Sequence, residues 1–220
     1  MEPIARFHSP FATKFGAPRQ SGVVPRLEGR IVFEPPYRND DAIRGMDEFS
    51  HLWLLWLFSA NRHATASLTV RPPRLGGNER MGVFATRSPY RPNPIGLSSV
   101  EIARIERHPT LGPVIHVLGA DLIDGTPIVD IKPYIAYTDA HPEARGGFTD
   151  TRRWQQLEVD ISPAVEALFT PQQLEALRGA LAQDPRPHYH DDPAKVYGML
   201  FAGHDIHFTV AHGRLTVLEP

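Results

Sequence analysis

The chain has 220 residues, a formal net charge of −2, 41% hydrophobic residues and 22% charged residues. These values fit an ordinary globular protein of one domain, or of one domain with a small appendage. The absence of cysteine excludes disulfides, thiolate metal sites and a cysteine nucleophile. The overall charge gives no sign of a nucleic-acid partner, so any such site must be a local basic patch.

The N-terminus, MEPIARFHSPF, has no apolar run after a basic start, which predicts that no signal peptide is present. The longest apolar run, His51–Phe58, is far shorter than the roughly 20 residues that cross a bilayer. Together with the lack of cysteine, these features predict a cytoplasmic protein without a membrane partner.

Short apolar runs separated by prolines and glycines fill the first part of the chain. The 22 prolines and 17 glycines of the whole chain are scattered, which favours many short strands joined by tight turns. His51–Phe58 is a strand or a short buried helix, and its two tryptophans favour a strand. The other predicted strands are Gly29–Phe33, Ala66–Arg71, Met81–Thr86, Ser98–Ile105, Pro113–Gly119, Ala120–Ile123 and Ile128–Ile131. This spacing is typical of a β-barrel or sandwich.

The C-terminal part has a different pattern. Ser162-Pro163 and Thr170-Pro171 are helix openings, since a capping hydroxyl precedes a proline at the first helical position. Asp205–Ala211 and Leu215–Leu218 then predict a hairpin. The polar, glycine-rich segment near Ala140–Thr151 predicts a boundary. We therefore expect a β domain over residues 1–140 and a small α+β domain over residues 151–220.

The loop Ala85–Ser98, ATRSPYRPNPIGLS, combines three prolines with Arg87 and Arg91. Because proline fixes φ, two guanidiniums on this loop are preorganised to clamp an anion or stack on a base. Gly96 would allow a ligand to approach the backbone closely. The alternative is a proline-rich crossover whose arginines are solvated or ion-paired.

A basic loop lies just before this stiff loop. Its arginines, Arg71, Arg74 and Arg80, together with Arg87 and Arg91, could form a phosphate-binding patch for RNA. A solvated loop is the alternative.

Two further segments are candidates for a site. The first is Asp124–Tyr134, DGTPIVDIKPY, in which a carboxylate at a turn could bind ribose hydroxyls or face a cation. The plainer interpretation of this segment is a hairpin with an Asx-turn and a surface ion pair. The irregular segment Phe11–Gln20 could be an arm that contributes to a site or a subunit contact, or a disordered N-terminus.

Two other groups of residues resemble known functional motifs but lack the surrounding sequence that those motifs require. Glu34–Tyr37, EPPY, is close to a motif of Rossmann-type methyltransferases, but no GxGxxG or βαβ pattern accompanies it. Pro35-Pro36 is therefore predicted to end the preceding strand. His188, His190, His204 and His207 match no metal-ligand spacing, so we expect surface histidines and no metal site.

The segments RPPRLGGNERMGVFATRSPYRPNPIGLSSVE, DLIDGTPIVDIKPY and KFGAPRQSG together resemble the TsaA/TrmO (YaeB-like) family. The resemblance covers residues 1 to about 138, and Asp184–His190 resembles the family's smaller tail domain. It implies a non-Rossmann β-barrel, a homodimer, and a tRNA N6-methyltransferase that uses S-adenosyl-L-methionine (SAM). The implied substrate is threonylcarbamoyladenosine beside the anticodon, typically in a threonine tRNA.

The resemblance also implies the residues that hold SAM, and these are Pro18, Arg19, Gln20, Ser59, Ala60, Arg87, Leu97, Asp124, Gly125, Thr126 and Pro127. Ser59-Ala60 departs from the family, which usually has histidine followed by Gln or Lys there. The catalytic base is unknown, with Asp124 and Tyr134 as candidates. Two alternatives stay open: a SAM-dependent methyltransferase with another substrate, and an RNA-binding module without catalysis.

Overall fold

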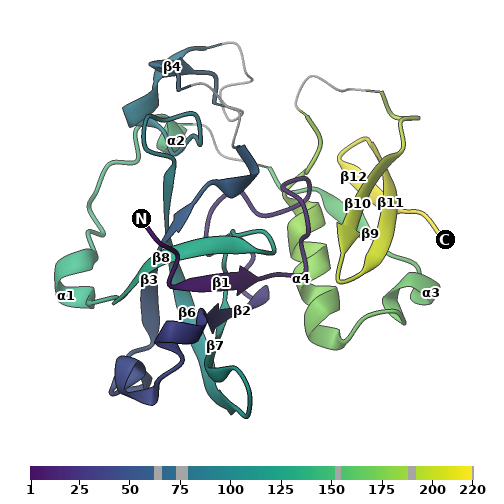
Figure 1. Cartoon of the computed structure of the whole chain (residues 1–220). Helices are drawn as coiled ribbons and strands as arrows, with labels where there is room; N and C mark the ends of the chain where they lie inside the picture. Colours follow the sequence, from purple (N-terminus) through teal and green to yellow (C-terminus); the bar gives the residue numbers. More distant parts are fainter. Residues whose placement is uncertain (62–65, 73–78, 152–154, 188–191, 220) are drawn as a thin grey trace.

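The computed structural model, which describes residues 1–61, 66–72, 79–151, 155–187 and 192–219, places a closed barrel beside a smaller α+β part (Figure 1). The barrel order is β1-β2-β7-β6-β3-β8, and all its neighbouring strands are antiparallel. This confirms the predicted mainly-β fold. The barrel strands are β1 (Ala5–His8), β2 (Glu28–Phe33), β3 (His51–Leu57), β6 (Ile95–His108), β7 (Gly112–Leu118) and β8 (Thr126–Pro133).

Strand β3 shows why the sequence forms this barrel. Alternate residues Leu52, Leu54 and Trp56 are buried in the barrel core, as the period of a strand requires. A Cβ on Gly96 would lie 2.2 Å from the Trp56 ring. The space that Gly96 leaves is therefore taken by Trp56, which corrects the prediction that a ligand approaches there.

Three predicted strands are wrong in whole or in part. Only two residues of each of the first two predicted strands form a strand: β4 (Thr69–Val70) within Ala66–Arg71, and β5 (Met81–Gly82) within Met81–Thr86. These two short strands pair with each other, and a 3-10 turn, η6 (Val83–Ala85), follows β5. Ala120–Ile123 forms no strand, although Ala120 and Leu122 are buried. Its alternation arises because the segment passes over the end of the barrel and buries every second side chain.

Short helical turns make up most of the remaining connections before residue 152. They are η1 (Pro35–Tyr37), η2 (Asp40–Ile43), η3 (Met46–Glu48), η4 (Ser59–Asn61), α1 (Ala136–Asp139) and α2 (Phe148–Thr151). The prediction that Pro35-Pro36 ends a strand is confirmed, because β2 stops at Phe33 and η1 follows. Within the described ranges, no helix has both the length and the apolar composition needed to cross a bilayer.

The C-terminal part packs helix α4 against a four-stranded sheet. Both predicted helix starts are confirmed in α3 (Pro163–Glu166) and α4 (Pro171–Ala182), and Thr170 and Gln173 form a capping box. The sheet order is β10 (Tyr197–Phe201), β11 (His204–Ala211), β12 (Arg214–Val217) and β9 (Glu158–Asp160). The β11–β12 hairpin was also predicted. The boundary itself stays a prediction.

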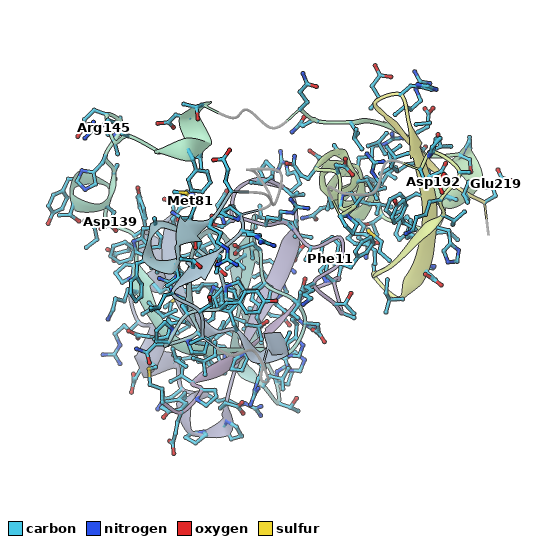
Figure 2. The ribbon with its side chains drawn as sticks, turned by 90° about the horizontal axis from the view of Figure 1, so that it is seen from above. Phe11, Met81, Asp139, Arg145, Asp192 and Glu219 are labelled. Carbon is cyan, nitrogen blue, oxygen red and sulfur yellow. The ribbon has the colours of Figure 1, made fainter. Side chains whose placement is uncertain are left out.

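The segment between β1 and β2, residues 9–27, joins the two parts, and we call it the arm. Its Phe11, Val24 and Leu27 are buried in the same hydrophobic cluster as α4 and the C-terminal sheet. Phe11 pairs with Phe201 through a β-bridge and an edge-to-face ring contact, with centroids 5.1 Å apart. Figure 2 shows Phe11 between the barrel and the C-terminal sheet. The C-terminal core is thus completed by residues from the beginning of the chain.

A charged cluster on the outside of the barrel links three strands. His116 Nδ1 lies 3.1 Å from Glu28 Oε1, and its Nε2 lies 2.8 Å from Glu106 Oε2. Burial acts to raise the pKa of Glu28, but hydrogen bonds from His116 and Arg104 outweigh it and lower that pKa. The hydrogen bond with His116 also lowers the pKa of Glu106. The folded protein therefore favours both carboxylates in their charged form.

We expect the stability from this cluster to be present above the ordinary glutamate pKa of about 4.3 and to be lost as the pH falls through and below it. The reason is that a lowered folded-state pKa makes the unfolded chain bind more protons. Urea unfolding of the wild type and of His116→Gln from pH 7 down to about pH 2 tests this. The variant should lose less stability on acidification, and an equal loss in both proteins would contradict the assignment.

Candidate functional site

The barrel has two ends, and the topology gathers the predicted site residues at one of them. We define the upper rim as the end where β1, β3 and β7 finish and β2, β6 and β8 begin, and the lower rim as the opposite end. In Figure 1 the arrowhead of β1 marks the upper rim and points toward α4. The segments that carry the predicted SAM positions all meet the upper rim: the arm, the turn after β3, the stiff loop before β6 and the turn before β8.

Arg87 and Gln20 meet at the upper rim although they are far apart in sequence. Arg87 Nη1 donates a hydrogen bond to Gln20 Oε1 over 2.6 Å. Pro18 is buried, whereas Arg19 and Arg87 are exposed. The stiff loop and the arm are therefore in direct contact, with a guanidinium facing solvent between them.

The turn after β3 continues this site. Phe58 N donates to Pro94 O over 2.9 Å, which attaches the turn to the stiff loop. Ser59 is half-buried and Ala60 is exposed at the start of η4. Leu97 points away from the barrel core and is 53% exposed. It supplies an apolar surface beside the polar groups.

The turn before β8 is held by the N-terminal strand. Gly125 has a φ of +73°, a conformation that glycine adopts without strain. Asp124 Oδ1 lies 3.2 Å from His8 Nδ1 and accepts a hydrogen bond from Ser9 N, also at 3.2 Å. Thr126 and Pro127 are buried and shape the turn. Asp124 and Gly125 are thus the parts of this motif that a ligand can reach.

The two candidates for a catalytic base do not lie together. Asp124 is on the upper rim, whereas Tyr134 follows β8 at the lower rim and packs against Trp53 and His51. The eight residues of β8, at about 3.3 Å each, separate them by roughly 25 Å. Within one copy of the chain, one site cannot use both.

The predicted RNA-binding arginines differ in their surroundings. Arg71 and Arg80 are exposed near β4 and β5, and Arg74 lies outside the described residues. Arg91 donates through Nη1 to Thr86 O over 3.0 Å and stacks over Phe84 at 6.0 Å. Arg91 therefore braces its own loop.

The other predicted polar groups have ordinary structural roles. Lys132 and Asp130 form a surface ion pair at 2.8 Å, as the plainer interpretation of that segment predicted. His188 and His190 lie outside the described residues, while His204 packs against Phe169 and His207 lies 3.4 Å from Asp205. Among the described residues, no three or more His, Asp or Glu side chains gather in an arrangement that could hold a metal ion.

Sequence reasoning missed a hydrogen-bonded chain beneath the upper rim. Trp56 Nε1 donates to Ser98 Oγ over 3.0 Å, and Ser98 Oγ donates to Asp121 Oδ1 over 2.5 Å. Burial raises the pKa of the Asp121 carboxyl above its ordinary value, against the lowering effects of Ser98, backbone N–H groups and the charge of Arg87. A polar residue inside the apolar run ADLI was the signal that could have been used.

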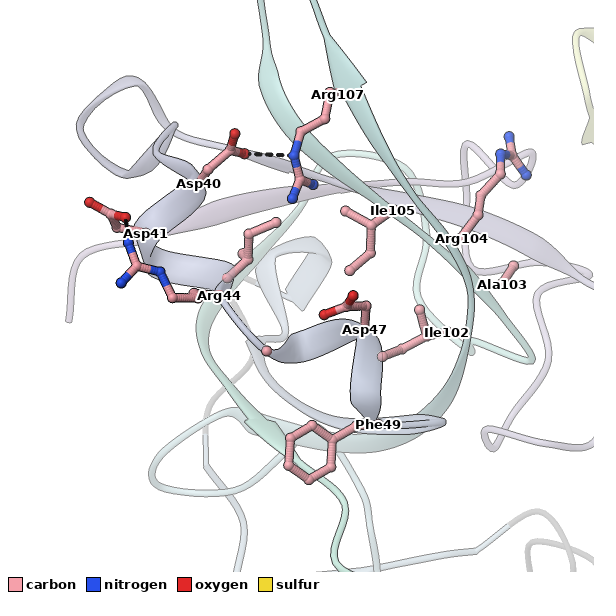
Figure 3. A pocket seen from close by; sticks show the side chains of 12 residues that line it. Asp40, Asp41, Arg44, Asp47, Phe49, Ile102, Ala103, Arg104, Ile105 and Arg107 are labelled. Carbon is pink, nitrogen blue, oxygen red and sulfur yellow. Dashed lines mark hydrogen bonds and ion pairs between the residues drawn. The ribbon is translucent and has the colours of Figure 1, made fainter.

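A groove of about 720 Å³ lies at the lower rim, away from these residues (Figure 3). It is lined by η2, η3 and the second half of β6. Several of its charged side chains pair with one another or with a neighbour, since Arg107 contacts Asp40 at 2.9 Å and Arg44 contacts Asp41. The predicted SAM positions do not line it.

The upper rim has the types of group that a SAM molecule requires. SAM carries a carboxylate, an ammonium, ribose hydroxyls and an adenine. The exposed Arg87 guanidinium suits the carboxylate, the Asp124 carboxylate suits an ammonium or hydroxyls, and Leu97 suits an apolar surface. These features define a small closed-barrel protein with an arginine-containing polar site on one rim.

Comparisons with known proteins agree with this definition. The family model described as the tRNA-methyltransferase O N-terminal domain matches residues 6–140, and the model of the C-terminal domain matches residues 154–219. The chain belongs to the tRNA-methyltransferase O family.

Relatives and solved structures cover nearly the whole chain. The tRNA (adenine(37)-N6)-methyltransferase of Escherichia coli (strain K12) is 41% identical over 100% of this chain and 97% of the relative. The putative S-adenosylmethionine-dependent methyltransferase RcsF of Pseudomonas aeruginosa is 38% identical over 94% of this chain and 91% of its own. The crystal structure of TrmO from Pseudomonas aeruginosa has a TM-score of 0.78 at 33% identity, covering 99% of this chain and 96% of that one.

Proposed function

We propose that this chain is a tRNA (adenine(37)-N6)-methyltransferase that takes its methyl group from SAM. The observation that carries this is the match along the full chain to a relative of that name, with both domains of the family present. The upper rim supports it independently, because it brings an arginine, carboxylates and an apolar surface together from distant parts of the sequence.

In this proposal Arg87 binds the carboxylate of SAM, Asp124 accepts hydrogen bonds from its ammonium or ribose, and Leu97 contacts an apolar part. Pro18, Arg19, Gln20, Ser59, Ala60 and Gly125–Pro127 complete the site. SAM would supply a methyl group bonded to its sulfonium sulfur. As the adenine N6 forms its bond to this methyl group, the S–CH3 bond breaks, the rest of SAM leaves as a thioether, and N6 gives up a proton to a base. The protein's own contribution is orientation, which lowers such barriers by roughly 7–11 kcal/mol for well-aligned reactants. Of the two candidate bases, Asp124 is the one placed at this rim.

The finer parts of the proposal come from the family resemblance. The adenosine is threonylcarbamoyladenosine beside the anticodon, in a threonine tRNA, and the enzyme works as a homodimer in the cytoplasm. Arg71, Arg74 and Arg80 contact the tRNA backbone, whereas Arg91 acts by holding the stiff loop. Contacts to phosphates would make tRNA binding weaken with salt.

Methyl transfer from labelled SAM into bulk tRNA from cells that lack this gene tests the proposal. We expect a new methylated threonylcarbamoyladenosine when the nucleosides are resolved by mass spectrometry. Labelling of a different nucleoside would support methyltransferase activity but would contradict the proposed substrate. The departure from the family at Ser59-Ala60 would then be relevant to the change of substrate. RNA binding without SAM binding or methyl transfer would support the RNA-binding module instead.

A further inference from the structure

Asp121 occupies a junction beneath the upper rim, in the segment between β7 and β8. The Ser98 hydroxyl has a single hydrogen, and its oxygen already accepts from the Trp56 indole at 3.0 Å. That hydrogen therefore points to Asp121 Oδ1, 2.5 Å away. The hydrogen bonds therefore have a fixed direction: the donors run from Trp56 in β3 through Ser98 in β6, and the final acceptor is the Asp121 carboxylate.

Other groups around Asp121 come from the arm and the stiff loop. The backbone N–H of Ser21 and the charge of Arg87 both favour the ionised carboxylate. Ser21 follows Gln20, Ser98 follows Leu97, and Arg87 is itself a predicted SAM contact. The carboxylate is hydrogen-bonded to Ser98 near the beginning of β6, and it lies close enough to the arm and the stiff loop to be stabilised by the Ser21 N–H and by the charge of Arg87.

Ionisation of Asp121 is nevertheless less favourable in the folded protein than in the unfolded chain. Burial outweighs the favourable contacts and raises the pKa of Asp121. A carboxyl whose pKa is raised on folding reduces stability once the pH exceeds its unfolded value, because the folded state then holds its proton more tightly than the unfolded chain. Carboxyl groups whose pKa is shifted by burial and by specific partners cluster at functional sites.

We propose that Asp121 is the positioning residue of the SAM site, and that it acts by holding Ser21, Ser98 and Arg87 in one arrangement. This rests on the proposed function, since it assigns the upper rim to SAM. Its charge attracts the guanidinium that receives the ligand's carboxylate and that Gln20 holds, and its hydrogen bond with Ser98 fixes the beginning of β6. It is not required to touch the reacting atoms.

Asp121→Asn separates positioning from a purely structural role. Asparagine keeps the shape and an oxygen for the Ser98 hydroxyl but removes the charge that faces Arg87. We expect calorimetric affinity for S-adenosylhomocysteine to fall by about tenfold or more, while the thermal midpoint at pH 8 is unchanged or higher. Asp130→Asn is the matched control, because Asp130 lies on the outer face of the same barrel. It should bind as the wild type does.

The pH dependence of binding is a second readout. Because positioning requires the ionised carboxylate, wild-type affinity should fall on acidification at a pH above the ordinary aspartate pKa of about 3.9. The Asn variant should lack this step.

Wild-type affinity in Asp121→Asn, or a loss of affinity matched by a large fall in thermal midpoint, would overturn the positioning role. Wild-type protein that fails to bind S-adenosylhomocysteine at all would instead remove the proposed function, and the positioning role with it. A wild type that binds and an Asn variant that binds weakly with full stability is the result that supports the proposal.

Discussion

Arg87→Ala is expected to weaken SAM binding by about 100-fold. The guanidinium is exposed at the upper rim and is held by Gln20 at 2.6 Å, so it is already placed before a ligand arrives. Removing one partner of a charge pair that a ligand encloses leaves the other charge unpaired, which costs roughly 2–5 kcal/mol. Isothermal titration with SAM measures this directly.

Arg107→Ala is the matched control for Arg87→Ala, since Arg107 is also exposed and pairs with Asp40 at the lower rim. It should leave SAM affinity unchanged. Gln20→Ala should have a smaller effect than Arg87→Ala, because it removes the support of the guanidinium and not the charge. Unchanged affinity in Arg87→Ala would show that the stiff loop is not a wall of the SAM site.

Phe11→Ala is expected to lower the free energy of unfolding by about 3–5 kcal/mol, as is usual when a fully buried phenylalanine is truncated. Phe11 has no exposed surface and contacts Phe201 edge to face. Its carbonyl also accepts from Asp124 N over 2.8 Å, so the arm links the C-terminal core to the turn before β8. For a chain of this size, thermal midpoints should fall by roughly 2–4 °C per kcal/mol.

The same variant should weaken SAM binding, because the arm that carries Pro18–Gln20 loses its anchor. Thermal unfolding with and without saturating S-adenosylhomocysteine measures both effects in one experiment. Phe49→Ala serves as the comparison, since Phe49 is 39% exposed at the lower rim. A loss below about 1 kcal/mol in Phe11→Ala would contradict the role given to the arm.

Much of the fold could be predicted because the local pattern and the final environment agree. Gly29–Phe33 and Pro113–Gly119 are short and mostly apolar, with β-branched residues, and both are barrel strands within a residue of the predicted bounds. Thr170-Pro171 carries its own helix signal in the capping hydroxyl. Ala120–Ile123 was wrong because burial every second residue does not require a strand partner.

The site was predictable mainly through the family resemblance. Proline density singled out the stiff loop, but sequence spacing could not show that Arg87 meets Gln20 across 67 positions. Asp121 was missed because a single carboxylate in an apolar run is ambiguous until its partner, Ser98, is placed beside it by the barrel register. Tyr134 shares a motif with Asp124, yet an extended strand carries it to the other rim.

The most direct test of the central claim is a crystal structure of this chain grown with S-adenosylhomocysteine. We predict density for the ligand at the upper rim, with its carboxylate at Arg87 and its remaining atoms between the arm, Leu97 and Asp124. Density in the lower-rim groove lined by Arg107 and Phe49, with an empty upper rim, would contradict the account.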